Sequence, residues 1–330
     1  MYSLKSVLIE VNTIKEETRN FWEYRQVTFK FQLSDISLFK VNLALQIRDI
    51  SLTEHLAAVE DLIPPSETCR SDSQGYAIRS LPVKKLFPTI TKKNNFYCYV
   101  QKQYQHCYID MQLSFDEYKQ KFSSKSRSTM NRKLNKFEEY CEKKNSWRVY
   151  KSAEEMLVFH RLARQVSEKT YQEKLLDAGI PDSPRFVKEM TALAADQQVR
   201  GYILFNDTVP VSYLYCPIVD DALIYAYLGY DPDYLKLSVG TVLQWLALQD
   251  MFAETRFKIF DFTEGQSEHK RFFSTHELSC ANVLFLRANI KNWILIYSHF
   301  CMDSLSKGLG DFLNRFGLKT KIKKILRFGF

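Results

Sequence analysis

Apolar and polar positions divide the chain into strand-like and helix-like stretches. Met1 to Asp110 is rich in strand-like runs, among them Arg25 to Leu33 and Phe39 to Ile47. Farther along, two such runs flank Asn206-Asp207-Thr208, and this polar triplet is typical of a hairpin turn because Asn and Asp tolerate left-handed backbone conformations. The pattern predicts strands at Val199 to Phe205 and Val209 to Cys216, joined by this turn.

More strands and helices are expected after the hairpin. A short apolar and aromatic run bounded by Gly229 and Pro232 favours a third strand. The order that follows is helix, strand, helix, strand. The expected elements are strands at Ala222 to Gly229, Lys258 to Phe262 and Ala281 to Arg287, with helices beginning at Thr241 and covering Gln266 to Phe273.

The start of the Thr241 helix is the most informative part of this pattern. Apolar residues from Val242 to Phe252 return at helical spacing, and Ser238 precedes them as an N-cap residue. Gly240 falls in the first turn, where a residue without Cβ weakens the helix unless something approaches the backbone closely. Free N–H groups at a helix start bind phosphate. Two interpretations stay open: a diphosphate site, or a capped helix in which Gly240 is incidental.

Several groups of residues between about Ser114 and Ile290 stand at characteristic spacings. They are Ser126-Arg127, Arg132-Lys133, Lys169-Thr170-Tyr171, then Gly229-Tyr230-Asp231-Pro232 with Tyr234, Lys236, Ser238 and Gly240, and Phe260-Asp261-Phe262 with Gly265, Lys270 and Arg271. In these residues the chain resembles the GNAT superfamily of acyl-CoA-dependent N-acyltransferases. Within it, the chain resembles the CelD/BcsL-like branch, which is related to FemAB-type transferases.

The resemblance implies an α/β (α+β) fold with a GNAT-like mixed, mostly antiparallel sheet flanked by helices, in two tandem GNAT-like halves. Residues 1–114 would be a degenerate amino-terminal half. Residues 115–290 would be the acyltransferase domain. The charge pattern adds to it a basic linking helix at 119–137 and, after it, a basic amphipathic helical tail at 291–330. Acetyl-CoA or another acyl-CoA would be the co-substrate, with no metal.

The resemblance also places a site at the predicted phosphate loop. The strand ends near Tyr227 and Asp261 would admit the pantetheine arm and the acceptor amine. Arg127, Tyr171, Lys270 and Arg271 are the predicted substrate contacts. The residues expected to bind the pyrophosphate of coenzyme A are Lys236, Ser238, Val239, Gly240 and Thr241.

Two positions depart from the family pattern. Leu235 and Ser238 stand where the superfamily loop has Gln or Arg and Gly, although the branch commonly carries Ser at the second position. His269 stands where members of the branch often have Tyr, a candidate proton donor to the leaving thiolate.

An amine that attacks a thioester must lose a proton, and the departing thiolate gains one. His269 suits either role because imidazole titrates near neutrality. Asp261 lies between Phe260 and Phe262, where desolvation would raise its pKa and make it a base. Structural alternatives stay open for both: Asp261 would pair with Lys270 or cap the next helix, and His269 would lie on a solvated helix face.

Tyr227 is a third candidate catalytic residue. Tyr225 and Tyr227 are two positions apart on one predicted strand and are expected to share a face. That arrangement suits packing within the sheet as well as acid catalysis.

Positive charge is concentrated at two places. The formal net charge is +8, and Lys291 to Phe330 holds eight basic and two acidic residues, a difference of +6. Lys319 to Arg327 mixes basic and apolar residues at near-helical spacing, which suits an anionic membrane surface, RNA or an acidic carrier protein, or a solvated terminal helix. The helix predicted at Lys121 to Phe137 combines an apolar stripe with basic faces.

Cysteine usage and motifs exclude several other chemistries. The seven cysteines form no CxxC pair, which argues against a zinc ribbon or a disulfide framework and fits a reducing cytoplasm. No GxSxG, GxxxxGK[ST] or HExxH motif occurs.

The expected function is therefore a cytoplasmic N-acyltransferase that moves an acyl group, most simply acetyl, from acyl-CoA to a small-molecule or sugar amine. The alternatives are FemAB-like transfer from aminoacyl-tRNA or acyl carrier protein, and a non-catalytic basic binding module.

Overall fold

A computed structural model describes residues 22–33, 36–54, 56–66, 70–141, 146–170, 173, 179–265 and 267–315. The chain divides into two compact units. The first unit is built from Cys107–Thr263 and Ser267–Glu277, and the second contains the described residues within Ile14–His106, Glu264–Gln266 and Leu278–Phe330.

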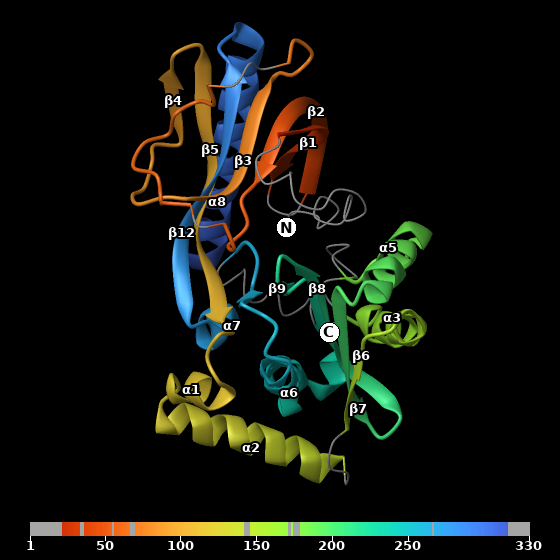
Figure 1. The fold of residues 1–330 in the computed structure, drawn as a ribbon. Helices are drawn as coiled ribbons and strands as arrows, with labels where there is room; N and C mark the ends of the chain where they lie inside the picture. Colours follow the sequence, from red (N-terminus) through yellow and green to blue (C-terminus); the bar gives the residue numbers. More distant parts are fainter. Residues whose placement is uncertain are drawn as a thin grey trace. The chain divides into compact units, whose positions relative to one another are not determined.

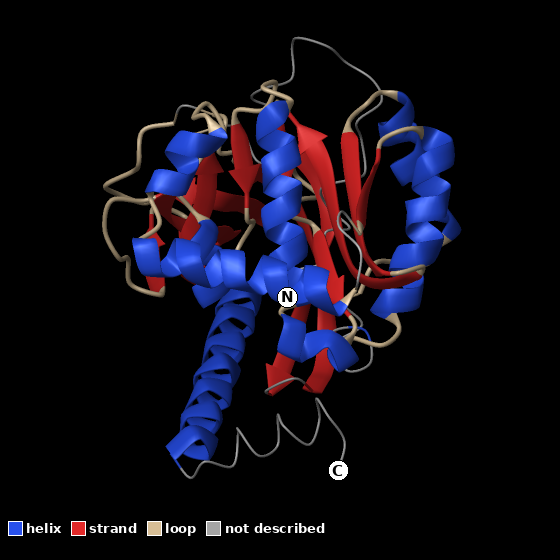
Figure 2. Cartoon of the chain, turned by 90° about the horizontal axis from the view of Figure 1, so that it is seen from below, coloured by secondary structure: helices blue, strands red, loops and turns tan. Residues whose placement is uncertain are grey.

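In the first unit, strands form a mixed and mostly antiparallel sheet with helices on both faces. Antiparallel pairing joins β6 to β7, β7 to β8, and β8 to both β9 and β10, whereas β9 and β11 pair in parallel. Figure 2 shows the helices (blue) on both sides of the strands (red). The strands are β6 (Trp147–Tyr150), β7 (Val199–Asn206), β8 (Val209–Val219), β9 (Ala222–Ile224), β10 (Tyr227–Tyr230) and β11 (Ile259–Asp261).

The helices of the first unit cover two separate hydrophobic cores. Residues of β7 alternate between them: Tyr202 and Leu204 pack with α6, and Ile203 and Phe205 pack with α3 and α5. The helices are α1 (Phe115–Gln120), α2 (Ser124–Tyr140), α3 (Ala153–Ser167), α5 (Pro184–Ala195), the 3₁₀ helix η2 (Pro232–Leu237), α6 (Val239–Ala253) and α7 (Glu268–Phe273).

The second unit contains a sheet in the order β1-β2-β3-β12-β5-β4, with α8 packed on β1 (Figure 1). His299 of α8 lies between Phe29 and Tyr99, and its Nδ1 is 2.6 Å from the Tyr99 hydroxyl. Strands β5 and β12 contribute residues to both units. The elements are β1 (Glu23–Leu33), β2 (Ile36–Asp49), β3 (Gly75–Pro82), β4 (Ile90–Lys93), β5 (Phe96–Asp110), β12 (His276–Arg287) and α8 (Ile290–Arg315).

The predicted fold class is confirmed, and so is the hairpin between β7 and β8, where Asp207 adopts φ 53°. The single strand predicted at Ala222 to Gly229 is wrong, because the chain changes partners in its middle. Tyr225 donates its N–H to the Asp261 carbonyl, and Ala226 donates to the Tyr215 carbonyl. Strand β9 therefore pairs with β11, while β10 pairs with β8 alone.

This change of partners overturns a second expectation. Tyr225 and Tyr227 were expected to share one face, but Tyr225 packs with the α6 core and Tyr227 with the core of α3 and α5. The break separates β10 from β11 at the point where α6 begins, so it also opens the sheet next to the predicted phosphate loop.

The basic segment Lys319 to Arg327 lies outside the described residues, so its helix stays a prediction. Among the helices in the described part of the chain, none combines the length and the apolar character needed to cross a bilayer.

Candidate active site

The chain enters α6 through a left-handed residue. Ser238 adopts φ 55° and ψ 36°, and its carbonyl accepts hydrogen bonds from the N–H groups of Thr241 and Val242 at 2.8 and 3.0 Å. Ser238 is thus the N-cap residue, as predicted, but its side chain makes no capping hydrogen bond. The hydroxyl of a Ser N-cap residue usually accepts a hydrogen bond from one of the first N–H groups of the helix, but the Ser238 hydroxyl accepts none.

Two backbone donors at this helix start have no hydrogen-bond partner in the described part of the chain. No described residue accepts a hydrogen bond from the N–H group of Val239 or of Gly240. Both residues are buried and line a cavity. Because buried N–H groups are nearly always paired, these two call for an acceptor from a ligand or from water.

Gly240 packs closely against the neighbouring strand. A Cβ at this position would lie 3.3 Å from Leu228 Cδ2 and 3.3 Å from Tyr230 Cδ1, both on β10. The glycine therefore lets the first turn of α6 approach the side chains of β10 closely. Gly240 therefore has a role in packing, which the sequence pattern alone could not distinguish from a role in phosphate binding.

Two cavities meet at the start of α6. The α6 cavity, of about 380 Å³, lies between β9–β10, the α6 start and α7. The α2 cavity, of about 320 Å³, lies between α2, α6 and α7. Thr241 and His269 line both. The α6 cavity is lined by Tyr225, Leu228, Tyr230, Leu235, Ser238, Val239, Gly240, Thr241, Ser267, His269 and Lys270, and the α2 cavity by Lys125, Ser126, Thr129, Met130, Lys133, Thr241, His269, Phe272 and Phe273.

The charge of this lining has one sign. Among the residues that the structure describes, the charged ones in these walls are Lys125, Lys133 and Lys270, and no Asp or Glu lines either cavity. No described carboxylate forms an ion pair with Lys125 or Lys133. Together with the positive end of the α6 dipole, these lysines favour an anionic ligand.

His269 is held between the two cavities as a neutral imidazole. Burial, with the charges of Lys133 and Lys270, lowers the pKa of His269 to about 4. Its Nε2 is buried and has no hydrogen-bond partner among the described residues, and its ring lies 4.9 Å from that of Phe273. A neutral imidazole at a cavity wall can accept a proton or donate a hydrogen bond to a bound ligand.

The other predicted catalytic residues lie outside the cavity walls. Asp261 is buried, and its Oδ1 accepts the Thr263 N–H at 2.6 Å, a contact that stabilises the turn after β11. The Tyr227 ring packs near Phe186 and Tyr215, and burial raises the pKa of Tyr227 to about 12. Catalytic roles for Asp261 and Tyr227 stay predictions.

Of the predicted binding residues, too, some line a cavity and others do not. Lys270 lines the α6 cavity, but Arg271 is exposed and pairs with Glu277 at 3.0 Å. Arg127 donates to the Phe122 carbonyl of its own segment at 2.6 Å. Lys236 is exposed and is not part of either cavity wall. Tyr171 lies outside the described residues.

Several residues that line the site were not among the predicted site residues. Tyr225 was assigned to sheet packing, yet it lines the α6 cavity beside Phe260 and Phe262, and burial raises the pKa of its hydroxyl. Thr129 and Phe272 were not considered at all. A four-residue spacing of Lys125, Thr129 and Lys133 was the available signal, since it places the three on one face of a helix.

The mixed sheet and the helices that flank it agree with a GNAT-like fold. Residues 124–271 match the family model of the acetyltransferase (GNAT) domain, and the match assigns this region to that class of N-acyltransferase enzymes. The predicted GNAT resemblance is confirmed. A comparison of the sequence with curated proteins finds no match.

Solved structures with a similar arrangement have little sequence identity to this chain. FemX is 12% identical with a TM-score of 0.45, over 68% of this chain and 75% of that one. The C-terminal domain of a putative lysylphosphatidylglycerol synthetase from Agrobacterium fabrum is 9% identical with a TM-score of 0.44, over 70% and 72%. The L-PGS structure from Bacillus licheniformis is 11% identical with a TM-score of 0.41, over 68% and 71%.

Proposed function

We propose that the first unit transfers an acyl group, most simply acetyl, from acyl-CoA to an amine. The observation that carries the proposal is the pair of N–H groups at Val239 and Gly240, which have no partner among the described residues and border a cavity without carboxylates. A diphosphate supplies acceptor oxygens for both donors, and its charge is stabilised by the α6 dipole.

The reaction needs one proton acceptor and one proton donor. The amine nitrogen attacks the thioester carbonyl carbon, the C–N bond forms, the C–S bond breaks, and the thiolate leaves with the bonding electron pair. His269 is neutral near pH 7 and borders both cavities, so it is placed to take the proton that the amine loses. The imidazolium formed in this way then returns the proton to the thiolate sulfur.

Tyr225 is a second candidate donor to the thiolate. It lines the α6 cavity on the side of the strand break, and its raised pKa keeps the hydroxyl protonated at neutral pH. Loss of activity in Tyr225→Phe with donor affinity retained would assign the final proton transfer to Tyr225 rather than to His269.

Gly240→Asp tests the phosphate site. The new carboxylate places negative charge at the helix start, and we expect calorimetry to show a loss of coenzyme A binding of at least about 100-fold. Gly240→Ala is the matched control: its Cβ meets the same side chains at 3.3 Å but adds no charge, so binding weakens far less. Circular dichroism must show both variants folded. Equal affinity in Gly240→Asp and wild type would overturn the site assignment.

The donor and acceptor are tested together. Incubation with labelled acetyl-CoA and separate pools of sugar amines, small metabolite amines and lysine peptides should label one pool in wild type and none in Gly240→Asp. Transfer from aminoacyl-tRNA or acyl carrier protein, with no affinity for coenzyme A, would replace the donor. Binding of coenzyme A without transfer to any pool would favour a non-catalytic binding module.

A further inference from the structure

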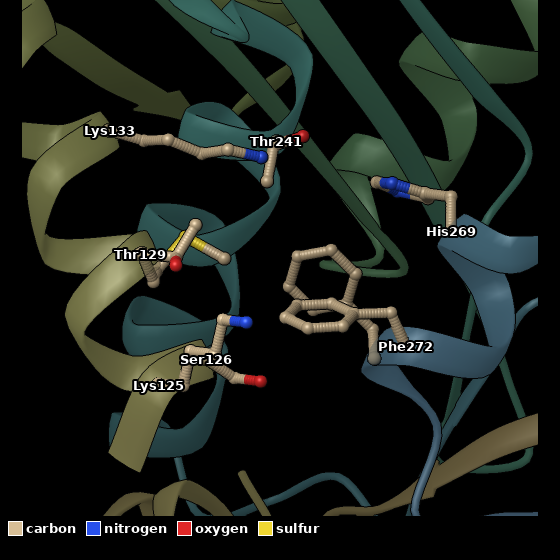
Figure 3. Close-up of a pocket in the computed structure, with 9 residues that line it drawn as sticks. Lys125, Ser126, Thr129, Lys133, Thr241, His269 and Phe272 are labelled. Carbon is tan, nitrogen blue, oxygen red and sulfur yellow. The ribbon is translucent and has the colours of Figure 1, made fainter. Parts of the chain in front are cut away.

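The α2 cavity is distinct in chemistry from the α6 cavity that it adjoins. Lys125, Thr129 and Lys133 stand at four-residue intervals, so one face of α2 presents two ammonium groups and a hydroxyl. Eight residues of helix separate the two lysines by about 12 Å. In Figure 3, Lys133 extends toward Thr241, at the α6 start, and Lys125 lies two turns away along the cavity.

The opposite wall of the α2 cavity is aromatic. Phe272 of α7 is 38% exposed although it is a large apolar residue, and Figure 3 shows it across the cavity from Ser126 and Thr129. The Phe272 ring packs on Phe122 at 5.0 Å, which holds it in place. An accessible aromatic face beside cations and hydroxyls suits a nucleobase, because a base stacks on the ring while its phosphate meets the ammonium groups.

The positive charge of the α2 cavity favours the acyl donor over the acceptor amine as its ligand. An acceptor amine is a cation before it loses its proton, and a wall with two lysines and no carboxylate repels it. A polyphosphate ligand has the opposite preference. The shared residues Thr241 and His269 place the α2 cavity next to the proposed diphosphate site.

We infer that the α2 cavity binds the adenosine 3′-phosphate end of the acyl-CoA donor. Lys125 meets the 3′-phosphate, Phe272 stacks on the adenine ring, and Lys133 lies beside the diphosphate at the α6 start. The inference rests on the proposed function and adds to it the place and the residues of the nucleotide. Helix α2 thereby supplies cations at the cavity wall, where the loop residues Leu235 and Ser238 carry no charge.

The test compares coenzyme A with dephospho-coenzyme A, which lacks only the 3′-phosphate. Calorimetry at low salt should give wild type roughly a tenfold preference for coenzyme A. Lys125→Ala should remove most of that preference while the affinity for dephospho-coenzyme A stays unchanged. Arg132→Ala is the control, because Arg132 is an exposed cation of the same helix outside both cavity walls and should keep the preference.

A second measurement uses adenosine 3′,5′-bisphosphate as the ligand. Phe272→Leu keeps an apolar side chain but removes the ring. It should lower the affinity for adenosine 3′,5′-bisphosphate about fivefold to tenfold without changing the affinity for phosphopantetheine. Equal binding of coenzyme A and dephospho-coenzyme A by wild type, with acyl transfer intact, would overturn this inference alone. Failure of both ligands to bind wild type would overturn the proposed function with it.

Discussion

At the scale of single residues, the pKa of His269 at the candidate site is influenced by parts of the chain that are distant in sequence. Lys270 is its neighbour in sequence, but Lys133 belongs to α2, and burial against Phe273 is the largest influence. The residue type therefore indicates a candidate proton carrier, whereas the lowered pKa depends on contacts that no local pattern contains.

We predict that NMR titration of the free protein gives His269 a pKa of about 4. The His269 signal is identified as the one that is missing from the spectrum of the His269→Gln variant. Coenzyme A should raise that pKa by about 1, because its phosphates offset the charges of Lys133 and Lys270. The NMR signal of the exposed His276, which lies outside both cavity walls, is the internal reference and should not move when coenzyme A is added. A His269 pKa near 6.5 in the free protein would contradict the burial seen here.

At the scale of elements, the loop before α6 is fixed by one buried carboxylate. Asp231 is 2% exposed; its Oδ1 accepts the N–H of Asp233 in η2, and its Oδ2 accepts a hydrogen bond from Lys169 Nζ at 2.6 Å. Its own N–H donates to the Val211 carbonyl of β8. Asp231 thus links the sheet, η2 and the segment after α3.

Lys169→Met should therefore loosen the phosphate loop. The variant leaves the Asp231 charge buried without its ammonium partner, which we expect to cost roughly 2 kcal/mol of unfolding free energy and to weaken coenzyme A binding severalfold. Urea unfolding and calorimetry measure the two effects. Lys188→Met, an exposed lysine of α5, is the control. Unchanged donor affinity in Lys169→Met would show that the loop holds its shape without this ion pair.

Elements were predictable where local patterns determine them. The hairpin of β7 and β8 follows from its polar turn, and α6 follows from Ser238 and the apolar period after it. The division of one predicted strand into β9 and β10 was not predictable, because it depends on the parallel pairing of β9 with β11, more than thirty residues away. The same limit applied to the site: the α6 start and the α7 residues His269 and Lys270 were identified, but the wall that α2 forms was not.

At the scale of the whole molecule, pairing between strands that are far apart in the sequence determines which segments make up each unit. Strand β12 pairs with β3 through Cys280↔Pro82 to Leu286↔Gly75, so the carboxyl-terminal part returns to the second unit. Sequence periodicity identifies such strands but not their partners. The tandem arrangement with boundaries at residues 114 and 290 stays a prediction, as does the basic tail.

Stability of the first unit against acid follows from one buried ion cluster. Glu254, at the end of α6, accepts hydrogen bonds from Arg200 at 2.6 and 2.8 Å and from Lys151 at 2.7 Å. Burial by itself raises the pKa of Glu254, but the hydrogen bonds and charges of Arg200 and Lys151 outweigh it and lower the pKa to about 2. Arg200 is itself nearly inaccessible, with 4% of its side chain exposed.

A carboxyl group whose pKa is lower in the folded state stabilises the fold above its unfolded pKa and loses this contribution as pH falls through the folded value. For Glu254 the window runs from about 4.5 down to about 2, and the contribution at neutral pH is on the order of 3 kcal/mol. Glu254→Gln should therefore unfold more easily at pH 7 and lose less additional stability between pH 4.5 and 2 than wild type does.

Fluorescence of Trp147 and Trp245 follows the first unit during urea unfolding, provided that Trp22 and Trp293 of the second unit are replaced by Phe. Glu139→Gln, an exposed carboxyl of α2, supplies the control and should behave as wild type at every pH. Parallel pH profiles for Glu254→Gln and wild type would mean that other carboxyl groups govern acid unfolding. The cluster would then hold α6 against β7 without controlling the stability of the unit.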